Sequence, residues 1–163
     1  MNKNFQIDST DKKILEILTK NAREPYLEVA RECGVTGAAI HQRVQKLFDA
    51  GLVGGSQFIL NPKGLGYHTC AYIGIQVNLT SPTTHETVFQ KIKQIPEVVE
   101  CHHISGRYSL FVKVFTKNNE HLKKLIIEKI QMIKEVTGTE TLVSLEEGFT
   151  RQVPIIEGDI MNY

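Results

Sequence analysis

Apolar residues in the first part of the chain recur at the spacing of short amphipathic helices. Ile14 and Leu18 lie on one side of a predicted first helix. Asp8 or Thr10 can cap its N-terminus, and the helix is expected to end near Asn21. The pattern therefore begins with one helix that buries a single face.

Two more helices are predicted around a tight turn. Gly34 suits the left-handed position that ends a second helix, and Thr36 can cap a third one over residues 36–50. The apolar stripe of this third helix consists of Ile40, Val44, Leu47 and Phe48. Two short helices joined by a turn that contains glycine form a helix-turn-helix pattern.

The opposite face of the third helix is polar but carries little charge. Glutamine side chains can pair with adenine in the major groove of DNA, and small residues at the helix start allow a close approach. The predicted DNA-binding residues are Thr36, Gly37, Ala38, His41, Gln42, Arg43, Gln45 and Lys46. Arg43 can either bind a phosphate or pair with an acid such as Asp49. An ordinary amphipathic helix in a three-helix cluster is the alternative interpretation.

The chain then changes character. Gly51 is expected to end the third helix, and residues 53–60 are typical of a short hairpin or extended arm, where a winged helix-turn-helix has its wing. Turn-forming residues fill 61–66. We therefore predict a helix-turn-helix domain over residues 1–61 and a second domain over 62–163.

The second half alternates strands and helices. The predicted strands are 68–77, 98–104, 109–115 and 139–145, and the helices begin at Pro82 and Asn118. Gly138 is expected to break the chain before the last strand. The order β-α-β-β-α-β indicates a ferredoxin-like domain in an α+β protein.

Such a sheet has helices on one face only, so its other face needs a cover. We expect Ala71, Ile73, Ile75 and Phe111 to supply apolar surface there. This predicts a homodimer that forms sheet to sheet.

Charge and cysteine content limit the function. The net charge is +1, and residues 1–60 hold eight Lys or Arg against seven Asp or Glu. This balance argues against a non-specific polyanion binder. The three cysteines are far apart, which indicates reduced thiols in a cytoplasmic protein, and no run of residues has the length of a membrane span.

Little in the chain points to catalysis or to a metal. No common catalytic or nucleotide-binding motif is present, so we do not expect an enzyme. Cys101, His102 and His103 are adjacent, but alternate residues of a strand point to opposite faces, so the three cannot share one ion. No metal or cofactor is expected.

Both halves together resemble one family of regulators. The residues that carry the resemblance are Asp8-x-x-Asp11-x-x-Ile14-Leu15, Gly34-Val35-Thr36, Ile40-x-x-Arg43-Val44-x-x-Leu47, Asn61-Pro62 and Ser105-Gly106-x-Tyr108. This order, from Ile7 to about Pro154, is similar to the Lrp/AsnC (feast/famine) family of transcriptional regulators, and most similar to its asparagine-responsive AsnC branch. The resemblance implies double-stranded DNA as partner, dimers that assemble toward octamers, and an amino-acid effector.

The resemblance also implies where the effector binds. The implied residues are Ser105, Gly106, Arg107, Tyr108, Ser109, Gln131, Thr139, Glu140 and Thr141. Many members have Asp where this chain has Ser109, so the ammonium group of the ligand needs another acceptor, such as a backbone carbonyl or Glu140. Asparagine is the expected effector. The alternatives are a ligand-independent architectural DNA-binding protein, an effector sensor that has lost DNA binding, and a ferredoxin-like enzyme.

Overall fold

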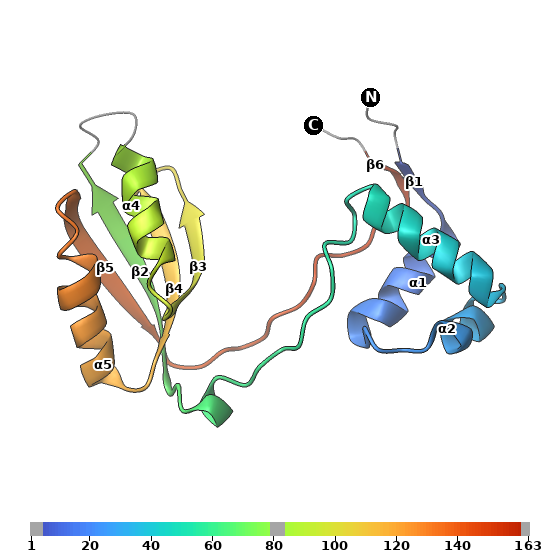
Figure 1. Ribbon diagram of the computed structural model, residues 1–163, viewed down its shortest axis with the longest axis horizontal. Coiled ribbons are helices and arrows are strands. Elements are labelled where there is room, and N and C mark those ends of the chain that lie inside the picture. Colours follow the sequence, from blue (N-terminus) through green and yellow to red (C-terminus); the bar gives the residue numbers. More distant parts are fainter. Residues whose placement is uncertain (1–4, 79–83, 161–163) are drawn as a thin grey trace. The chain divides into compact units, whose positions relative to one another are not determined.

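The computed structural model describes residues 5–78 and 84–160 and divides the chain into two compact units (Figure 1). The first unit contains Met1–Ile59 and Phe149–Tyr163, and the second contains Leu60–Gly148. The division after Ile59 lies close to the predicted boundary. The predicted second domain ran to residue 163, whereas the last fifteen residues group with the first unit.

Three helices form the core of the first unit: α1 (Ser9–Lys20), α2 (Tyr26–Cys33) and α3 (Gly37–Asp49). Asp8 is the N-cap of α1, and the side chains of Asp8 and Asp11 each accept a hydrogen bond from the other residue's backbone N–H. This reciprocal arrangement satisfies two N–H groups that a helix start leaves without partners. The buried residues that hold the helices together are Ile14, Val29, Ala30, Ile40 and Val44.

The turn between α2 and α3 forms as predicted. Gly34 has φ of 67°, which is the left-handed conformation that glycine adopts without strain. The Thr36 hydroxyl accepts a hydrogen bond from the Ala39 backbone N–H at 3.2 Å. Phe48 was predicted to be buried and is 41% exposed. At 3.6 residues per turn it lies about 80° around the helix from Ile40, which places it at the edge of the apolar stripe.

A two-stranded sheet completes the first unit. Strand β1 (Phe5–Ile7) pairs in antiparallel fashion with β6 (Gly158–Ile160), and Figure 1 shows the two side by side. Of the two forms predicted for residues 53–60, the structure shows the extended arm and not the hairpin, because this mostly exposed segment contains no strand. The pairing of β1 with β6 was not predicted, since three-residue strands far apart in the sequence leave no local pattern.

The second unit is a four-stranded antiparallel sheet with helices on one face (Figure 1). Its elements in chain order are the short 3-10 helix η1 (Lys63–Leu65), β2 (Thr69–Val77), α4 (Thr84–Lys93), β3 (Val98–His103), β4 (Leu110–Thr116), α5 (Asn119–Lys124), its π-helical continuation η2 (Leu125–Ile130) and β5 (Val136–Ser144). The strand order β3-β4-β2-β5 confirms the ferredoxin-like topology. Pro82 and Thr83, where α4 was predicted to begin, lie outside the described residues.

The predicted composition of the uncovered sheet face needs correction. Ala71, Ile73 and Ile75 are fully buried among α4, α5 and η2, so they do not face the uncovered side. The uncovered face carries instead their alternate neighbours, such as Tyr72 and its cross-strand partner Leu142, because successive strand residues point to opposite faces. Phe111, which stacks on Tyr72 with ring centroids 6.0 Å apart, was placed correctly.

Gly138 lies inside β5 and does not break the chain before it. It pairs with Gln76 next to a shift in register. A Cβ atom at this position would lie 2.7 Å from the Gln76 side-chain oxygen, so a glycine allows the two strands to stay paired.

Candidate nucleic-acid and effector sites

The exposed face of α3 is the candidate DNA-binding surface. Thr36, Ala38, His41, Gln42, Gln45 and Lys46 are exposed, and Gly37 is half-buried at the first position of the helix. The Tyr26 ring contacts the His41 ring edge-on, with centroids 4.5 Å apart, which places the imidazole next to the start of α2. The Gln45 amide donates a hydrogen bond to Asp49 at 2.8 Å. The structure therefore holds this set on one face of one helix.

Arg43 differs from the other predicted DNA-binding residues because its guanidinium group points into the domain. Nη1 lies 2.7 Å from an Asp11 oxygen and 2.8 Å from an Asp8 oxygen. Arg43 thus pairs with acids, which was one of its two predicted roles, but these acids come from the start of α1 and Asp49 is not among them. These hydrogen bonds raise the pKa of Arg43 above its ordinary value, and the bond to Asp11 has the larger effect. Arg43 thus joins α3 to α1.

Asp8 is held as an anion by the same contacts. Its hydrogen bond from the Asp11 backbone N–H lowers the pKa of Asp8, and the guanidinium group of Arg43 lowers it further against the effect of burial. Asp8 follows β1 directly in the chain, so the ion pair connects α3 to the strand that pairs with β6.

The turn between β3 and β4 is the candidate effector site. Gly106 has φ of 121°, a conformation that side chains rarely adopt. The Ser109 N–H donates a hydrogen bond to the Ile75 carbonyl at 2.9 Å, and the Gln76 amide donates one to the Arg107 carbonyl at 3.5 Å. Strand β2 therefore holds the turn against the sheet.

A glycine in β2 makes room for the aromatic ring of this turn. A Cβ atom at Gly74 would lie 2.7 Å from the Tyr108 ring, so any side chain there would displace the tyrosine. The guanidinium carbon of Arg107 lies 5.4 Å from the centroid of the Tyr108 ring, and Arg107 forms a 3.4 Å ion pair with Glu140. One positive and one negative group are thus exposed beside one aromatic ring.

The predicted effector residues do not form one cluster within a chain. Thr139 and Thr141 pair with Ile75 and Ile73, whose side chains are buried on the helix-covered face. Gln131 donates a hydrogen bond to Thr139 at 2.9 Å on that side. Glu140 lies between the two threonines in β5 and points to the other face, towards Arg107. The sheet separates the two groups.

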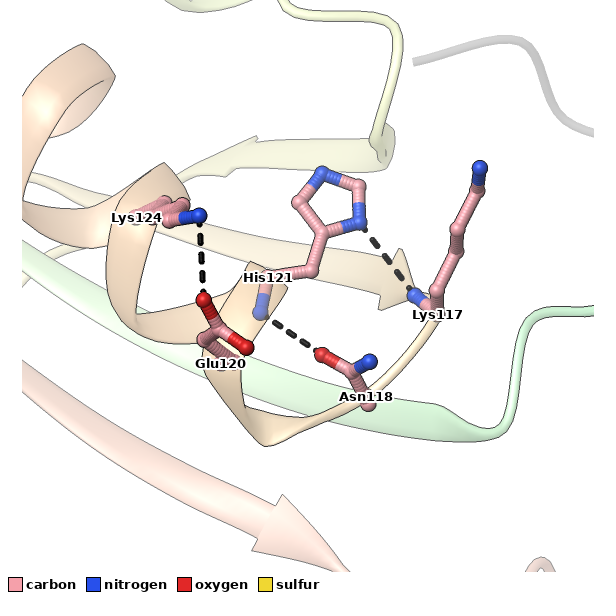
Figure 2. A pocket seen from close by; sticks show the side chains of 5 residues that line it. All are labelled: Lys117, Asn118, Glu120, His121 and Lys124. Atoms are coloured by element: carbon pink, nitrogen blue, oxygen red, sulfur yellow. Dashed lines mark hydrogen bonds and ion pairs between the residues drawn. The ribbon is translucent and has the colours of Figure 1, made fainter.

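An open depression of about 320 Å³ lies elsewhere in this unit, at the start of α5. Figure 2 shows the residues that line it, which include His121, Lys117 and Asn118. The Lys117 N–H donates to His121 Nδ1 at 3.3 Å, so Nε2 carries the proton that His121 donates to Glu97 at 3.1 Å. None of the predicted effector residues lines this depression.

Comparison with known proteins gives a consistent result. Residues 7–47 match the AsnC-type helix-turn-helix domain, and residues 70–153 match the Lrp/AsnC ligand binding domain. The regulatory protein AsnC of Haemophilus influenzae is 42% identical over 147 residues, which cover 90% of this chain and 97% of that protein. The chain belongs to the Lrp/AsnC family. Its relatives are transcriptional regulators and not enzymes.

Other Lrp/AsnC members share both sequence and fold. AsnC of Escherichia coli K12 is 38% identical over 150 residues, which cover 92% of this chain and 97% of that protein. The solved structure of E. coli AsnC superposes with a TM-score of 0.85 at 36% identity, covering 93% of this chain and all of that chain. This Lrp/AsnC chain therefore combines a helix-turn-helix domain and a ligand-binding domain. In the part that the structure describes, no helix is long and apolar enough to cross a membrane.

Reasoning from sequence missed three residues that shape the candidate sites of this Lrp/AsnC chain. Asp8 and Asp11 position Arg43, and Gly74 makes room for Tyr108. Asp8 carried a visible signal as a possible cap of α1, but nothing local connects either acid to a residue more than thirty positions later. Gly74 lies in an apolar strand and has no pattern that marks its neighbour.

Proposed function

We propose that this regulator binds specific DNA sequences and that a small amino acid, with asparagine favoured, modulates its binding or assembly. The observation that carries the proposal is the exposed face of α3, which begins with small residues at the capped helix start and continues with Gln42 and Gln45. Side-chain amides of this kind form paired hydrogen bonds with adenine, whereas a face that is only solvated usually carries more charge.

The effector proposal rests on the charges at the turn. A free amino acid carries one carboxylate and one ammonium group. Arg107 offers a cation for the first and Glu140 an anion for the second, and the two lie beside Tyr108. The tyrosine hydroxyl and the hydroxyl of Ser109 suit a polar side chain such as the amide of asparagine. A bound ligand would replace the Arg107–Glu140 ion pair by two pairs of its own.

We further propose a homodimer that assembles to a larger oligomer, with an octamer expected, in the cytoplasm. The uncovered face of the sheet supports the dimer, because Tyr72, Phe111 and Leu142 give it an apolar surface. Each additional subunit brings another α3 to the DNA. Repeated contacts of this kind suit a chain with a net charge of only +1.

The DNA proposal can be tested by fluorescence anisotropy with an operator fragment selected from random sequence. Wild-type binding should weaken steeply with salt, because each phosphate contact releases counterions. Gln42→Ala and Gln45→Ala should lose about 1–3 kcal/mol of discrimination per lost base contact. Gln90→Ala in the other unit is the matched control and should bind as wild type does. Unchanged discrimination in both α3 variants would show that another surface reads the sequence.

The effector proposal is tested by thermal-shift measurements with each amino acid. A ligand that binds only the folded protein raises its melting temperature, and asparagine should give the largest rise. Arg107→Gln and Glu140→Gln should each reduce that rise. DNA binding without a response to any amino acid would favour the ligand-independent architectural protein.

A further inference from the structure

Two histidines from different elements meet in the second unit. His85 is in the first turn of α4, and His103 is the last residue of β3. Their Nδ1 atoms are 3.2 Å apart, and their ring centroids are 5.1 Å apart. Phe89, one helical turn after His85, lies against the His103 ring with centroids 5.2 Å apart. A helix and a strand thus hold two imidazoles together.

The separation of the two nitrogen atoms suits two ligands of one metal ion. Zinc–nitrogen bonds of about 2.0–2.1 Å place two ligand atoms about 3.4 Å apart at a tetrahedral angle and about 2.9 Å apart at a right angle. The observed 3.2 Å lies between these values. In the structure the two Nδ1 atoms are hydrogen-bonded to each other, so a bound ion would take the place of the shared proton.

Strand geometry selects His103 and excludes its neighbour. His103 pairs with Leu110, which is buried on the helix-covered face, so both residues face α4. His102 pairs with Phe111 on the uncovered face and lies 3.9 Å from Glu100. Cys101 shares the face of His103, but it pairs with Val112 and packs against the hydrophobic core of the second unit.

We propose that His85 and His103 bind one divalent transition-metal ion of the kind that prefers imidazole, such as Zn²⁺. Among residues 5–78 and 84–160, no group of three or more metal-ligating side chains gathers anywhere. Water would therefore complete the coordination, and the site is open and exchanges its metal readily. The ion would tie the start of α4 to the end of β3.

The test is a calorimetric titration of the full-length, reduced protein with Zn²⁺. Wild type should bind one ion per chain. His85→Ala and His103→Ala should each weaken binding at least about tenfold, since loss of a direct ligand costs no less than loss of an outer-shell partner. His102→Ala is the matched control, because it removes an adjacent imidazole from the other face, and it should bind as wild type does.

Melting temperatures measured with and without Zn²⁺ separate a loss of metal binding from a failure of a variant to fold. Without metal, all three variants should melt close to wild type, because the removed rings are exposed or only half-buried. Zn²⁺ should raise the melting temperature of wild type and His102→Ala but not of the other two variants. Equal Zn²⁺ binding by wild type, His85→Ala and His103→Ala would overturn the proposal. Absence of Zn²⁺ binding by wild type, or its loss in His102→Ala alone, would also overturn it.

Discussion

At the scale of single residues, the ion pairs of Arg43 hold α3 in place against the start of α1. Asp11 is nearly buried, with 7% of its side chain exposed, and it accepts one of the two hydrogen bonds from Arg43. A buried carboxylate that loses its partner keeps the cost of desolvation without compensation. Arg43 is therefore a positioning residue for α3 within the first unit.

Arg43→Gln should lower the free energy of unfolding of the first unit by about 1–3 kcal/mol. Urea denaturation followed by circular dichroism measures this loss. Arg31→Gln is the matched control, because Arg31 forms only an exposed ion pair with Glu28, and it should cost less than about 1 kcal/mol. Wild-type stability in Arg43→Gln together with weaker DNA binding would point to a phosphate contact instead.

At the scale of elements, Glu97 connects three parts of the second unit. It precedes β3 and accepts hydrogen bonds from Lys129 in η2, at 2.9 and 3.0 Å, and from His121 in α5. Its side chain is 11% exposed. Burial alone would raise the pKa of Glu97, but the bonds from Lys129, from its own backbone and from His121 together hold it below the ordinary value.

This lowered pKa predicts an acid-sensitive contribution to stability. Folding favours the ionised carboxyl group, so the contribution is complete above the unfolded pKa of about 4.3 and is lost as the pH falls through the lower folded value. Glu97→Gln should cost about 1–3 kcal/mol at pH 7, and its difference from wild type should shrink in acid. Urea denaturation of wild type and Glu97→Gln at pH 7 and in acid measures this difference in the free energy of unfolding. Glu120→Gln is the control, because Glu120 forms only an exposed ion pair with Lys124 in the part of the chain that the structure describes. A difference that does not change with pH would contradict the role of Glu97.

The pairing of β6 with β1 makes the C-terminal segment part of the first unit. Lys12 in α1 also forms a 3.5 Å ion pair with Glu157, just before β6. A chain that ends at Gly148 loses this sheet, whose hydrogen bonds contribute about 1 kcal/mol each.

Truncation after Gly148 should therefore destabilise the first unit by a few kcal/mol and leave the second unit unchanged. Hydrogen exchange measured by mass spectrometry resolves the two units separately. Glu157→Gln removes only the exposed ion pair and should change exchange little. Equal protection of α1 in the truncated and full-length chains would show that β6 is dispensable.

At the scale of the whole molecule, one face of the four-stranded sheet has no helix layer over it. Leu142 is 54% exposed on the uncovered face, and Ile127 is 47% exposed on the helix layer. A charge at the centre of an apolar interface is costly, whereas a charge on a solvated surface is not.

Leu142→Glu should therefore shift the protein from dimer or larger oligomer towards monomer, and Ile127→Glu should not. Size-exclusion chromatography with light scattering gives the masses directly. If Leu142→Glu kept the wild-type mass, the sheet face would not be the interface.

Much of the architecture follows from local pattern. The spacing of apolar residues predicted α1 to α3, and the capping residues Asp8, Thr36 and Asn118 predicted helix starts. Runs of strand-forming residues between turn residues predicted the four strands of the second unit. These features depend on neighbours within a few positions, so the sequence itself carries them. The candidate DNA-binding face was predictable for the same reason.

Tertiary structure decided whatever depends on residues far apart in the chain. It pairs β1 with β6 and brings Asp8 and Asp11 to Arg43. It also packs the Tyr108 ring against Gly74, and it buries Ala71, Ile73 and Ile75 under the helices. Alternation along a strand shows that two faces differ, but only the packed helices determine which face is covered. The sequence by itself determined the elements and their order, while contacts across the fold determined which side chains meet.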